Sequence, residues 1–432
     1  MDSDDKTLMN GSGTRPTCVR YWVIVFAVTL SVITYIDRVC ISQAAPEIQK
    51  DLGLSTEQMG WALSAFFWAY ALFEVPSGWL GDRIGARKVL MRVVMWWSFF
   101  IAATGWAFSF VWLVITRALF GAGEAGCYPN LTRAFTNWLP QSERVRSQGL
   151  IWLSSRWGGA FTPLLVALIL QHISWRYTFG IFGLLGIIWA IFFYIWFRDN
   201  PRDNKSINKA ELAIVPRQQD VVLGHEKIPW AKIIESKTVW LLWLQFFCLN
   251  FGAVFYITWL PKYLREGRGM DITYGALLAG FPLFFGGLGS LFCGYISAPL
   301  AKLLGSTLFA RRLLAGFGFF GAASCLAIST LIPNPWLAMV VMGLASFCND
   351  LVMPTSWGTC MDIGRKFAGT LSGSMNMMGN FGGGFAAVAI GYILAWSNHN
   401  WNVALYVAAG VYFLGTFCWL FIDPVTPIDN RS

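Results

Sequence analysis

Long apolar stretches separated by short polar segments dominate the chain. A stretch of roughly 19–30 apolar residues is long enough to cross a bilayer as a helix, and twelve such stretches occur. They cover residues 20–45, 57–80, 89–107, 110–132, 147–170, 177–197, 238–261, 273–300, 313–332, 335–360, 367–396 and 401–422. The pattern predicts an all-α integral membrane protein with twelve transmembrane helices. The first stretch is too long, and its flanks are too polar, for a cleaved signal peptide.

One long polar interval, residues 198–237, divides the apolar stretches into six and six. This layout predicts two six-helix bundles related by pseudo-symmetry. We expect a cytoplasmic tail over 1–19, an N-terminal bundle over 20–197, a cytoplasmic linker over 198–237, a C-terminal bundle over 238–422 and a second tail over 423–432. In the second half of the chain, a polar turn that includes Arg311 corresponds to the turn after the second stretch, but it lacks an acid. We therefore expect it to hold neighbouring helix ends together more weakly.

Composition and charge support a membrane protein. Of the 432 residues, 56% are hydrophobic and 13% are charged, whereas a soluble protein of this length needs more polar surface. Most lysines and arginines fall in the tails, the linker and alternate loops, which places both termini in the cytoplasm. This bias also accounts for the net charge of +9, so a nucleic-acid partner is not invoked. We expect a multi-pass protein of a bacterial inner membrane.

Cofactor and metal chemistry find no support in the sequence. The nine cysteines lie mostly inside apolar stretches without paired spacing, which is typical of core residues. His172, His225 and His399 are too scattered for a metal site. A Gly-Lys dipeptide is missing, so there is no phosphate-binding loop for ATP. A membrane-embedded enzyme is disfavoured because no histidine within a helix core can serve as a base. We therefore expect no cofactor and no catalytic residue.

The turn after the second stretch, Gly78 to Lys88, is rich in glycine and charge. Glycines let helix ends approach closely, and the acid and bases can clamp neighbouring helix ends in one state of a moving protein. An ordinary positively charged cytoplasmic turn is the alternative. The turn resembles the helix 2–3 loop signature of the major facilitator superfamily, which it matches at Gly78, Asp82, Arg83, Gly85, Arg87 and Lys88.

Ionisable residues inside the apolar stretches are functional candidates, because isolated charge in hydrocarbon is costly. Counting about 1.5 Å per residue places Arg38 and Arg117 at similar depths, about 10 Å from the outer ends of their helices. Two guanidinium groups at one level repel each other unless an anion lies between them, and their planar donors fit carboxylates bidentately. The pattern favours an anionic substrate. Alternatively, Arg38 pairs with Asp37, or both arginines reach to the membrane surface.

Three segments sharpen the family resemblance: Ile36-Asp37-Arg38, the arginine-then-glutamate pattern of Arg117 and Glu124, and Asn200-Pro201-Arg202. Together they resemble the anion:cation symporter family, which includes proton-coupled transporters of hexonates, hexarates and hexuronates. The resemblance implies that Arg38 and Arg117 bind the substrate carboxylate and that Asp37 and Glu124 are protonation sites. An arriving anion competes with a carboxylate for arginine, so substrate binding and protonation favour each other.

Arg156 departs from the family pattern, which often has an uncharged polar residue in this part of the fifth helix. Arg156 and Glu124 lie about 13 and 10 Å from the inner face by residue counting. Either Arg156 neutralises Glu124, or it binds a second anionic group of the substrate. Glu74 serves either cytoplasmic gate packing or proton relay, and Asp350 is a further candidate.

Polar side chains are also expected to bind substrate hydroxyl groups. Each of them could instead make a hydrogen bond between helices. The candidates are Tyr35, Tyr70, Tyr128, Asn250, Tyr256, Ser356, Trp357 and Asn376.

The sequence thus predicts a monomeric secondary transporter that uses the proton gradient to take up a small organic anion, foremost a sugar acid, by alternating access. A different carboxylate, either a dicarboxylate or an aromatic acid such as a phthalate, is the alternative cargo. A sensor that does not transport is a third reading, against which the set of protonatable and arginine residues argues.

Overall fold

The computed structural model describes residues 15–215, 230–270, 272–398 and 400–428. Residues 1–14 and 429–432 of the predicted tails, residues 216–229 of the predicted linker, and His225 and His399 lie outside the described residues. Over the described ranges the chain is helical, with short turns between helices and no strand. Helices therefore satisfy the backbone polar groups internally, as a bilayer demands.

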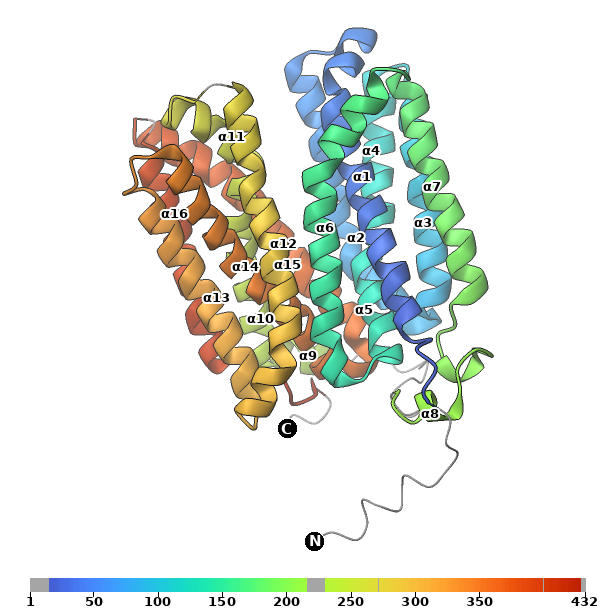
Figure 1. Ribbon diagram of the computed structural model, residues 1–432. Coiled ribbons are helices and arrows are strands. Elements are labelled where there is room, and N and C mark those ends of the chain that lie inside the picture. Colours follow the sequence, from blue (N-terminus) through green and yellow to red (C-terminus); the bar gives the residue numbers. More distant parts are fainter. Residues whose placement is uncertain (1–14, 216–229, 271, 399, 429–432) are drawn as a thin grey trace.

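Helices from the first half form one bundle, which we call the N bundle (Figure 1). Its helices are α1 (Tyr21–Leu52), α2 (Thr56–Ile84), α3 (Ala86–Gly105), α4 (Phe110–Glu124), α5 (Cys127–Trp138), α6 (Gln141–Leu170) and α7 (Trp175–Trp196). The chain then passes through two short helical segments, η2 (Pro201–Asp203) and α8 (Lys209–Leu212).

Helices from the second half form the C bundle. It begins with α9 (Trp230–Glu235), α10 (Lys237–Val254), the π-helical turn η4 (Phe255–Trp259), α11 (Leu260–Lys262) and a second π-helical turn, η5 (Tyr263–Gly267). It continues with α12 (Ile272–Leu303), α13 (Thr307–Ser329), α14 (Pro335–Gly364), the 3-10 turn η6 (Arg365–Phe367), α15 (Ala368–Trp396) and α16 (Trp401–Phe421).

Two of the membrane crossings are composite. Helices α4 and α5 form one crossing that is interrupted near Ala125. Pro129 has no backbone N–H to donate to the carbonyl four residues earlier, so the helix cannot run straight through this point. In the C bundle, α10, η4 and α11 also follow one another along a single crossing, and π-helical turns such as η4 are frequent at functional sites.

Apolar length agrees with membrane crossing. Within the described residues, nine spans are long and apolar enough to cross a bilayer, and one of them, Pro335–Leu394, contains both α14 and α15. Helices α2 and α6, of 29 and 30 residues, complete a set of twelve crossings. Large apolar side chains on their outer faces, such as Trp61 and Phe67 of α2, are more than half exposed, as expected for surfaces that contact lipid.

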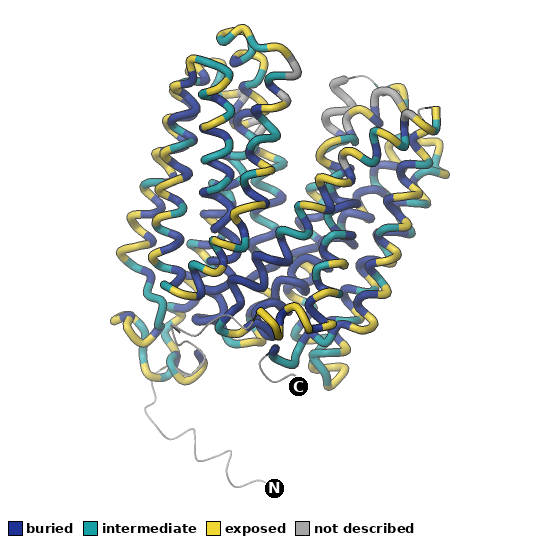
Figure 2. The backbone as a smooth tube through the Cα atoms, turned by 180° about the vertical axis from the view of Figure 1, so that it is seen from behind, coloured by how far each residue is buried: buried dark blue, intermediate teal, exposed yellow. Residues whose placement is uncertain are grey.

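The two bundles meet at one end and diverge at the other. We call the end that carries α8, α9 and the start of α1 the linker side, and the opposite end the far side (Figure 1). Viewed from behind, buried backbone is concentrated where the bundles join in the middle and on the linker side (Figure 2). The contacts that join the bundles, which are described below, are therefore placed where they can close the linker side.

Close backbone approach between the bundles depends on glycine. A Cβ atom on Gly78 of α2 would lie 2.3 Å from the carbonyl oxygen of Gly369 in α15. Likewise, a Cβ atom on Gly149 of α6 would lie 2.5 Å from the carbonyl oxygen of Ser290 in α12. Small residues at such crossings let helices pack backbone to backbone. The N and C bundles thus touch along α2–α15 and along α6–α12.

The chain that leaves the N bundle folds back onto the start of α1. Glu211 of α8 is fully buried and accepts hydrogen bonds from the backbone N–H groups of Val19 and Arg20. Arg20 also forms ion pairs with Glu211 and with Glu143 at the start of α6. The hydrogen bond to Glu143 is the main reason that the pKa of Arg20 is raised above its ordinary value. The first part of the linker is therefore fixed to the N bundle.

Candidate functional site

A buried ion pair between α1 and α4 forms the centre of the site. The Arg38 Nε–H donates to Oε1 of Glu124. The Glu124 side chain is fully buried, whereas the Arg38 side chain keeps 21% of its surface exposed. Because a charge that faces hydrocarbon is costly, the exposed part of the Arg38 side chain is expected to face a polar space and not lipid.

Aromatic rings surround the Arg38 guanidinium. Its central carbon lies 4.6 Å from the ring centroid of Tyr70, 5.3 Å from that of Phe66 and 5.6 Å from that of Tyr35. Cation–π contacts of this kind stabilise a cation that has lost part of its hydration. The rings also leave the planar edge of the guanidinium as the part that can receive an anion.

Arg117 of α4 is the second arginine of the site. It is buried and has no ion-pair partner among the described residues. Its guanidinium carbon lies 4.6 Å from the ring centroid of Phe120 and 5.3 Å from that of Phe66. Its Nε and Nη1 atoms donate no hydrogen bond within the described residues. Since a buried cation without a partner is costly, these donors are available to an incoming acceptor.

Asp37 is the second acid of the site. It is fully buried, and neither of its oxygens accepts a hydrogen bond within the described residues. Its charged and polar neighbours are Glu124, Arg117 and Trp97. Asp37, Arg117 and Glu124 therefore interact electrostatically, and Arg117 is the cation that the two acids share.

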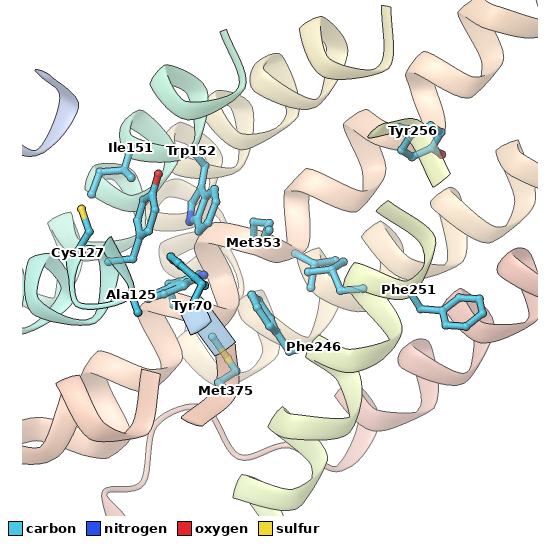
Figure 3. Packing of buried hydrophobic residues seen from close by; sticks show 14 of the residues in the cluster. Tyr70, Ala125, Cys127, Ile151, Trp152, Phe246, Phe251, Tyr256, Met353 and Met375 are labelled. Carbon is cyan, nitrogen blue, oxygen red and sulfur yellow. The ribbon is translucent and has the colours of Figure 1, made fainter. Parts of the chain in front are cut away.

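An aromatic cluster closes the site toward the linker side. The Tyr128 ring of α5 stacks on Trp152 of α6, with centroids 5.2 Å apart, and both contact Trp357 of α14. The Tyr128 hydroxyl is hydrogen-bonded to Ser155 at 3.0 Å. The Trp357 ring also contacts Phe246 of α10, with centroids 6.3 Å apart, and Figure 3 shows Trp152 and Phe246 among the buried side chains of this region. Because the cluster draws on both bundles, it must part when they separate on the linker side.

The structure corrects the predicted partner of Arg156. Arg156 does not neutralise Glu124, which is paired with Arg38. Instead, Arg156 forms a bidentate ion pair with Asp350 of α14, in which Nε–Oδ2 and Nη2–Oδ1 are both 2.9 Å. Equal depth along two helices does not determine which way their side chains point, and α6 turns Arg156 toward the C bundle.

A second acid of the N bundle is bonded across the interface. Glu74 of α2 is fully buried and accepts hydrogen bonds from the side-chain amides of Asn376 and Asn380 of α15. Asn376, which the sequence suggests as a substrate ligand, is thus occupied by Glu74 in this state. The placement agrees with gate packing by Glu74, the first of its two expected roles.

The glycine-rich turn joins the bundles on the linker side. Asp82 accepts hydrogen bonds from the backbone N–H groups of Gly369 and Thr370, at 3.0 and 2.6 Å, and from the Thr370 hydroxyl at 2.6 Å. Its Oδ1 atom also lies 3.7 Å from Nε of Arg133. A carboxylate at the N-terminus of α15 satisfies N–H groups that lack partners in the helix.

The remaining motif residues stay within the N bundle. Gly85 has a φ of +94° and connects α2 directly to α3, a backbone conformation that favours glycine. The Arg87 backbone N–H donates to Asp199 at 3.0 Å, and its guanidinium donates to the carbonyl of Tyr194. Arg83 lies over the Trp79 ring. Lys88 is exposed.

Sequence reasoning missed an acid that gathers cations on the linker side. Asp362, near the end of α14, pairs with Arg144 of α6 and with Arg311 of α13. Gln141 donates to the same carboxylate at 3.1 Å. The turn after α12 has no acid of its own, but Asp362 supplies one from another helix. The feature of the sequence that could have indicated Asp362 is its position as an acid close to the end of a predicted helix.

Other predicted ligands make contacts inside the C bundle. Ser356 is hydrogen-bonded to Gln245 of α10 and is fully buried. The Asn250 amide donates to a carbonyl of its own helix. The Tyr256 hydroxyl is buried without a hydrogen-bond partner among the described residues, and Tyr256 lies apart from the cluster around Trp152 (Figure 3). These three do not join Arg38 in this state.

The described residues contain no group of three or more histidine, cysteine or acidic side chains suited to a metal ion. The site consists instead of arginines and carboxylates of the N bundle, and the pair of Arg156 and Asp350 links it to the C bundle. Such an arrangement can bind an anion on arginine while a carboxylate takes a proton, and it can be exposed to one side or the other as the bundles rock.

Comparison with known proteins establishes the family. The family model of the Major Facilitator Superfamily matches residues 27–387. The chain therefore belongs to this superfamily and is a membrane transporter, not an enzyme. The predicted all-helical fold is also confirmed. The Escherichia coli fucose:proton symporter superposes with a TM-score of 0.72 at 13% identity, over 94% of this chain and 99% of that chain.

Relatives extend over almost the whole chain. The probable sulfoacetate transporter of Cupriavidus necator is 32% identical and covers 92% of each protein. The hexuronate transporter of Bacillus subtilis is 30% identical, covering 86% of this chain and 87% of the relative. The D-galactonate transporter of Escherichia coli O6:H1 is 28% identical, covering 94% and 96%. The relatives thus match the family that the sequence motifs indicated.

Proposed function

We propose that this protein takes up a small organic anion of the sugar-acid class together with protons, by alternating access. Relatives described as transporters of hexuronate and D-galactonate support this substrate class. The observation that carries the proposal is the ion pair between Arg38, which solvent reaches, and Glu124, which is fully buried.

Coupling follows from competition for the arginines. A substrate carboxylate that binds Arg38 displaces Glu124, which is then a buried carboxylate without a cation. Such a group binds a proton in preference to remaining charged in low dielectric. Arg117 offers the substrate carboxylate a second cation, and Asp37 offers the proton a second carboxylate. Both side chains have polar atoms without hydrogen-bond partners among the described residues. Substrate and proton therefore load together.

Orientation determines which side of the membrane the bundles open toward in this state. The bias of lysine and arginine places both termini, and hence the linker side, in the cytoplasm. We place the protein as a monomer in the bacterial inner membrane. In this orientation the closed linker side faces the cytoplasm and the diverging ends of the bundles face outward (Figure 1). Opening toward the cytoplasm requires that Asp82 and Glu74 release α15.

Uptake by the purified protein in proteoliposomes tests this proposal. Labelled hexonates, hexarates, hexuronates and aromatic acids are each supplied with an inward proton gradient, with an inward sodium gradient, or with neither. We expect a sugar acid to accumulate only when protons drive it. Accumulation driven by sodium alone would contradict proton coupling.

An aromatic acid is the second candidate cargo. The cluster of Tyr128, Trp152 and Trp357 offers ring faces beside the charged site. Accumulation of a phthalate without any sugar acid would favour this candidate over the first.

A further inference from the structure

The ion pair between Arg156 and Asp350 differs from the contacts that Glu74 and Asp82 make between the bundles, because both of its ends are charged side chains. Two hydrogen bonds of 2.9 Å join them. The Asp350 side chain is fully buried, and the Arg156 side chain is 7% exposed. Burying a charged pair is costly unless its geometry is good, and this bidentate geometry satisfies that condition.

Apart from Arg156, residues of the C bundle hold Asp350 in place. Asn349 donates to Oδ1 of Asp350 at 3.1 Å, and the Tyr412 hydroxyl donates to Asn349 at 3.0 Å. A Cβ atom on Gly286 would lie 2.3 Å from Oδ2 of Asp350, so α12 approaches the carboxylate closely. Asp350 is therefore a fixed acceptor, and Arg156 is the part that leaves when α6 and α14 move apart.

Arg156 lies next to the central site. Tyr35 interacts electrostatically with Arg156, and its ring centroid is 5.6 Å from the guanidinium carbon of Arg38. A Cβ atom on Gly159, one helical turn after Arg156, would lie 3.0 Å from the Tyr35 ring. Tyr35 is thus a common neighbour of Arg38 and Arg156, and each arginine is paired with a carboxylate.

We propose that Arg156 binds a second acidic group of the substrate, and that Asp350 occupies its place in the unloaded protein. The inference rests on the proposed function and narrows the substrate to dianions: small molecules with acidic groups at both ends. One acidic group binds Arg38 with Arg117, and the other binds Arg156. The bidentate contact with Asp350 already shows that Arg156 presents its planar edge to a carboxylate.

Charge balance indicates that Asp350 takes up a proton when the substrate binds Arg156. When the substrate takes Arg156, the Asp350 carboxylate loses its cation and binds one proton from the solvent on the open side. On release of the substrate, Asp350 gives up that proton and pairs with Arg156 again. The other titratable groups that face the pair are Tyr35 of α1, Tyr256 of η4 and Tyr412 of α16.

A pair that merely latches the bundles together is the competing account, and substrate charge separates the two. The test measures proteoliposome uptake of galactarate, a dianion, and galactonate, the matched monoanion. The main variant is Arg156→Gln with Asp350→Asn, in which two amides replace the ion pair without leaving a lone buried charge. Arg146→Gln is the control, because this exposed arginine of the same helix donates to the Tyr295 hydroxyl of α12 and its loss removes a contact between the bundles away from the site.

We expect the neutral pair to lower the ratio of galactarate to galactonate uptake about tenfold or more, since a hydrogen bond to a charged group is worth that factor. The control keeps the wild-type ratio. An equal fall in both substrates would overturn the proposal, because a latch does not sense the second acidic group. Thermal unfolding of each purified variant shows that it is folded.

Exchanging the charges gives an independent result. Arg156→Asp with Asp350→Arg restores an ion pair between the bundles but moves the cation to the other helix. We expect this variant to regain thermal stability without regaining galactarate uptake; recovery of wild-type galactarate uptake would overturn the proposal. Wild-type uptake of galactonate alone would reject the dianion site and leave the proposed function intact. Uptake of neither substrate, nor of any other sugar acid, would reject the proposed function itself.

Discussion

Thr370 donates both its backbone N–H and its hydroxyl to one oxygen of Asp82, each at 2.6 Å. The acid belongs to the N bundle and the threonine to the first turn of α15 in the C bundle. Helix α15 has no side-chain cap of its own. A residue of the opposite bundle therefore performs the capping, and this helix end is satisfied only while the linker side is closed.

We predict that Asp82→Asn favours the state that is open on the linker side. The amide keeps an acceptor oxygen but loses the charge, and a hydrogen bond to a charged group is worth about 1.5–3 kcal/mol. Electron paramagnetic resonance distances between spin labels at exposed Lys88 and Lys302 measure the populations. Asp203→Asn, an exposed acid on the same side, is the control. An unchanged distance distribution in Asp82→Asn would contradict the clamp.

Replacing Arg38 by lysine tests the anchor for the anion. Lysine keeps the charge but cannot offer two parallel donors to a carboxylate. We expect initial uptake of the transported anion to fall at least about tenfold, with normal amounts of folded protein in the membrane. The exposed Arg146→Lys is the matched control. Wild-type uptake by Arg38→Lys would show that a point charge suffices at this position.

The sequence was sufficient to predict the helical fold and the individual charged candidates. Twelve apolar stretches leave few alternatives in a bilayer, and Arg38 or Glu124 stands out because charge is rare inside such stretches. The pairing of charges was harder to predict. Counting residues gives the height of Arg156 and Glu124 in the membrane, but not the rotation of each helix about its axis or the identity of its neighbour. The actual partner, Asp350, is 194 residues away.

Hydrogen-bond partners that are backbone groups cannot be recognised in the sequence. Asp82 stands out in the sequence, but Gly369 and Thr370 do not, because they donate to it through backbone N–H groups that nearly every residue possesses. Asn376 illustrates the opposite case, in which a polar side chain is conspicuous but its partner is not. Its amide is taken by Glu74, so a suggested substrate ligand serves as a contact between bundles in this state.

Asp199, in the turn after α7, allows a prediction about pH and stability. Burial raises the pKa of Asp199 above its ordinary value, against the opposing effects of the Arg87 backbone N–H and of Arg133. The folded state therefore holds this proton more tightly than the unfolded state, and the free energy of unfolding rises as pH falls through the raised pKa toward about 4. Asp199→Asn cannot gain this stabilisation.

Thermal unfolding in detergent measures the effect. The melting temperature of Asp199→Asn, taken relative to wild type, should be higher at pH 8 than at pH 5. At pH 8 only the wild type carries the cost of a desolvated carboxylate at this position. Asp203→Asn, at an exposed acid of the same linker, is the control variant. A difference between Asp199→Asn and wild type that is the same at both pH values would contradict the prediction.

Glu124→Gln separates substrate binding from proton coupling. Glutamine has the shape of the protonated acid but cannot release a proton, and it leaves Arg38 without its carboxylate. We expect proton-driven accumulation to be lost, while exchange of labelled for unlabelled substrate across the membrane is partly kept. Exchange needs the bundles to rock only with substrate bound, whereas accumulation needs the empty protein to return deprotonated. Both are measured in the same proteoliposomes, with and without a proton gradient. If Glu124→Gln still accumulates substrate against its gradient, Asp37 carries the coupling proton.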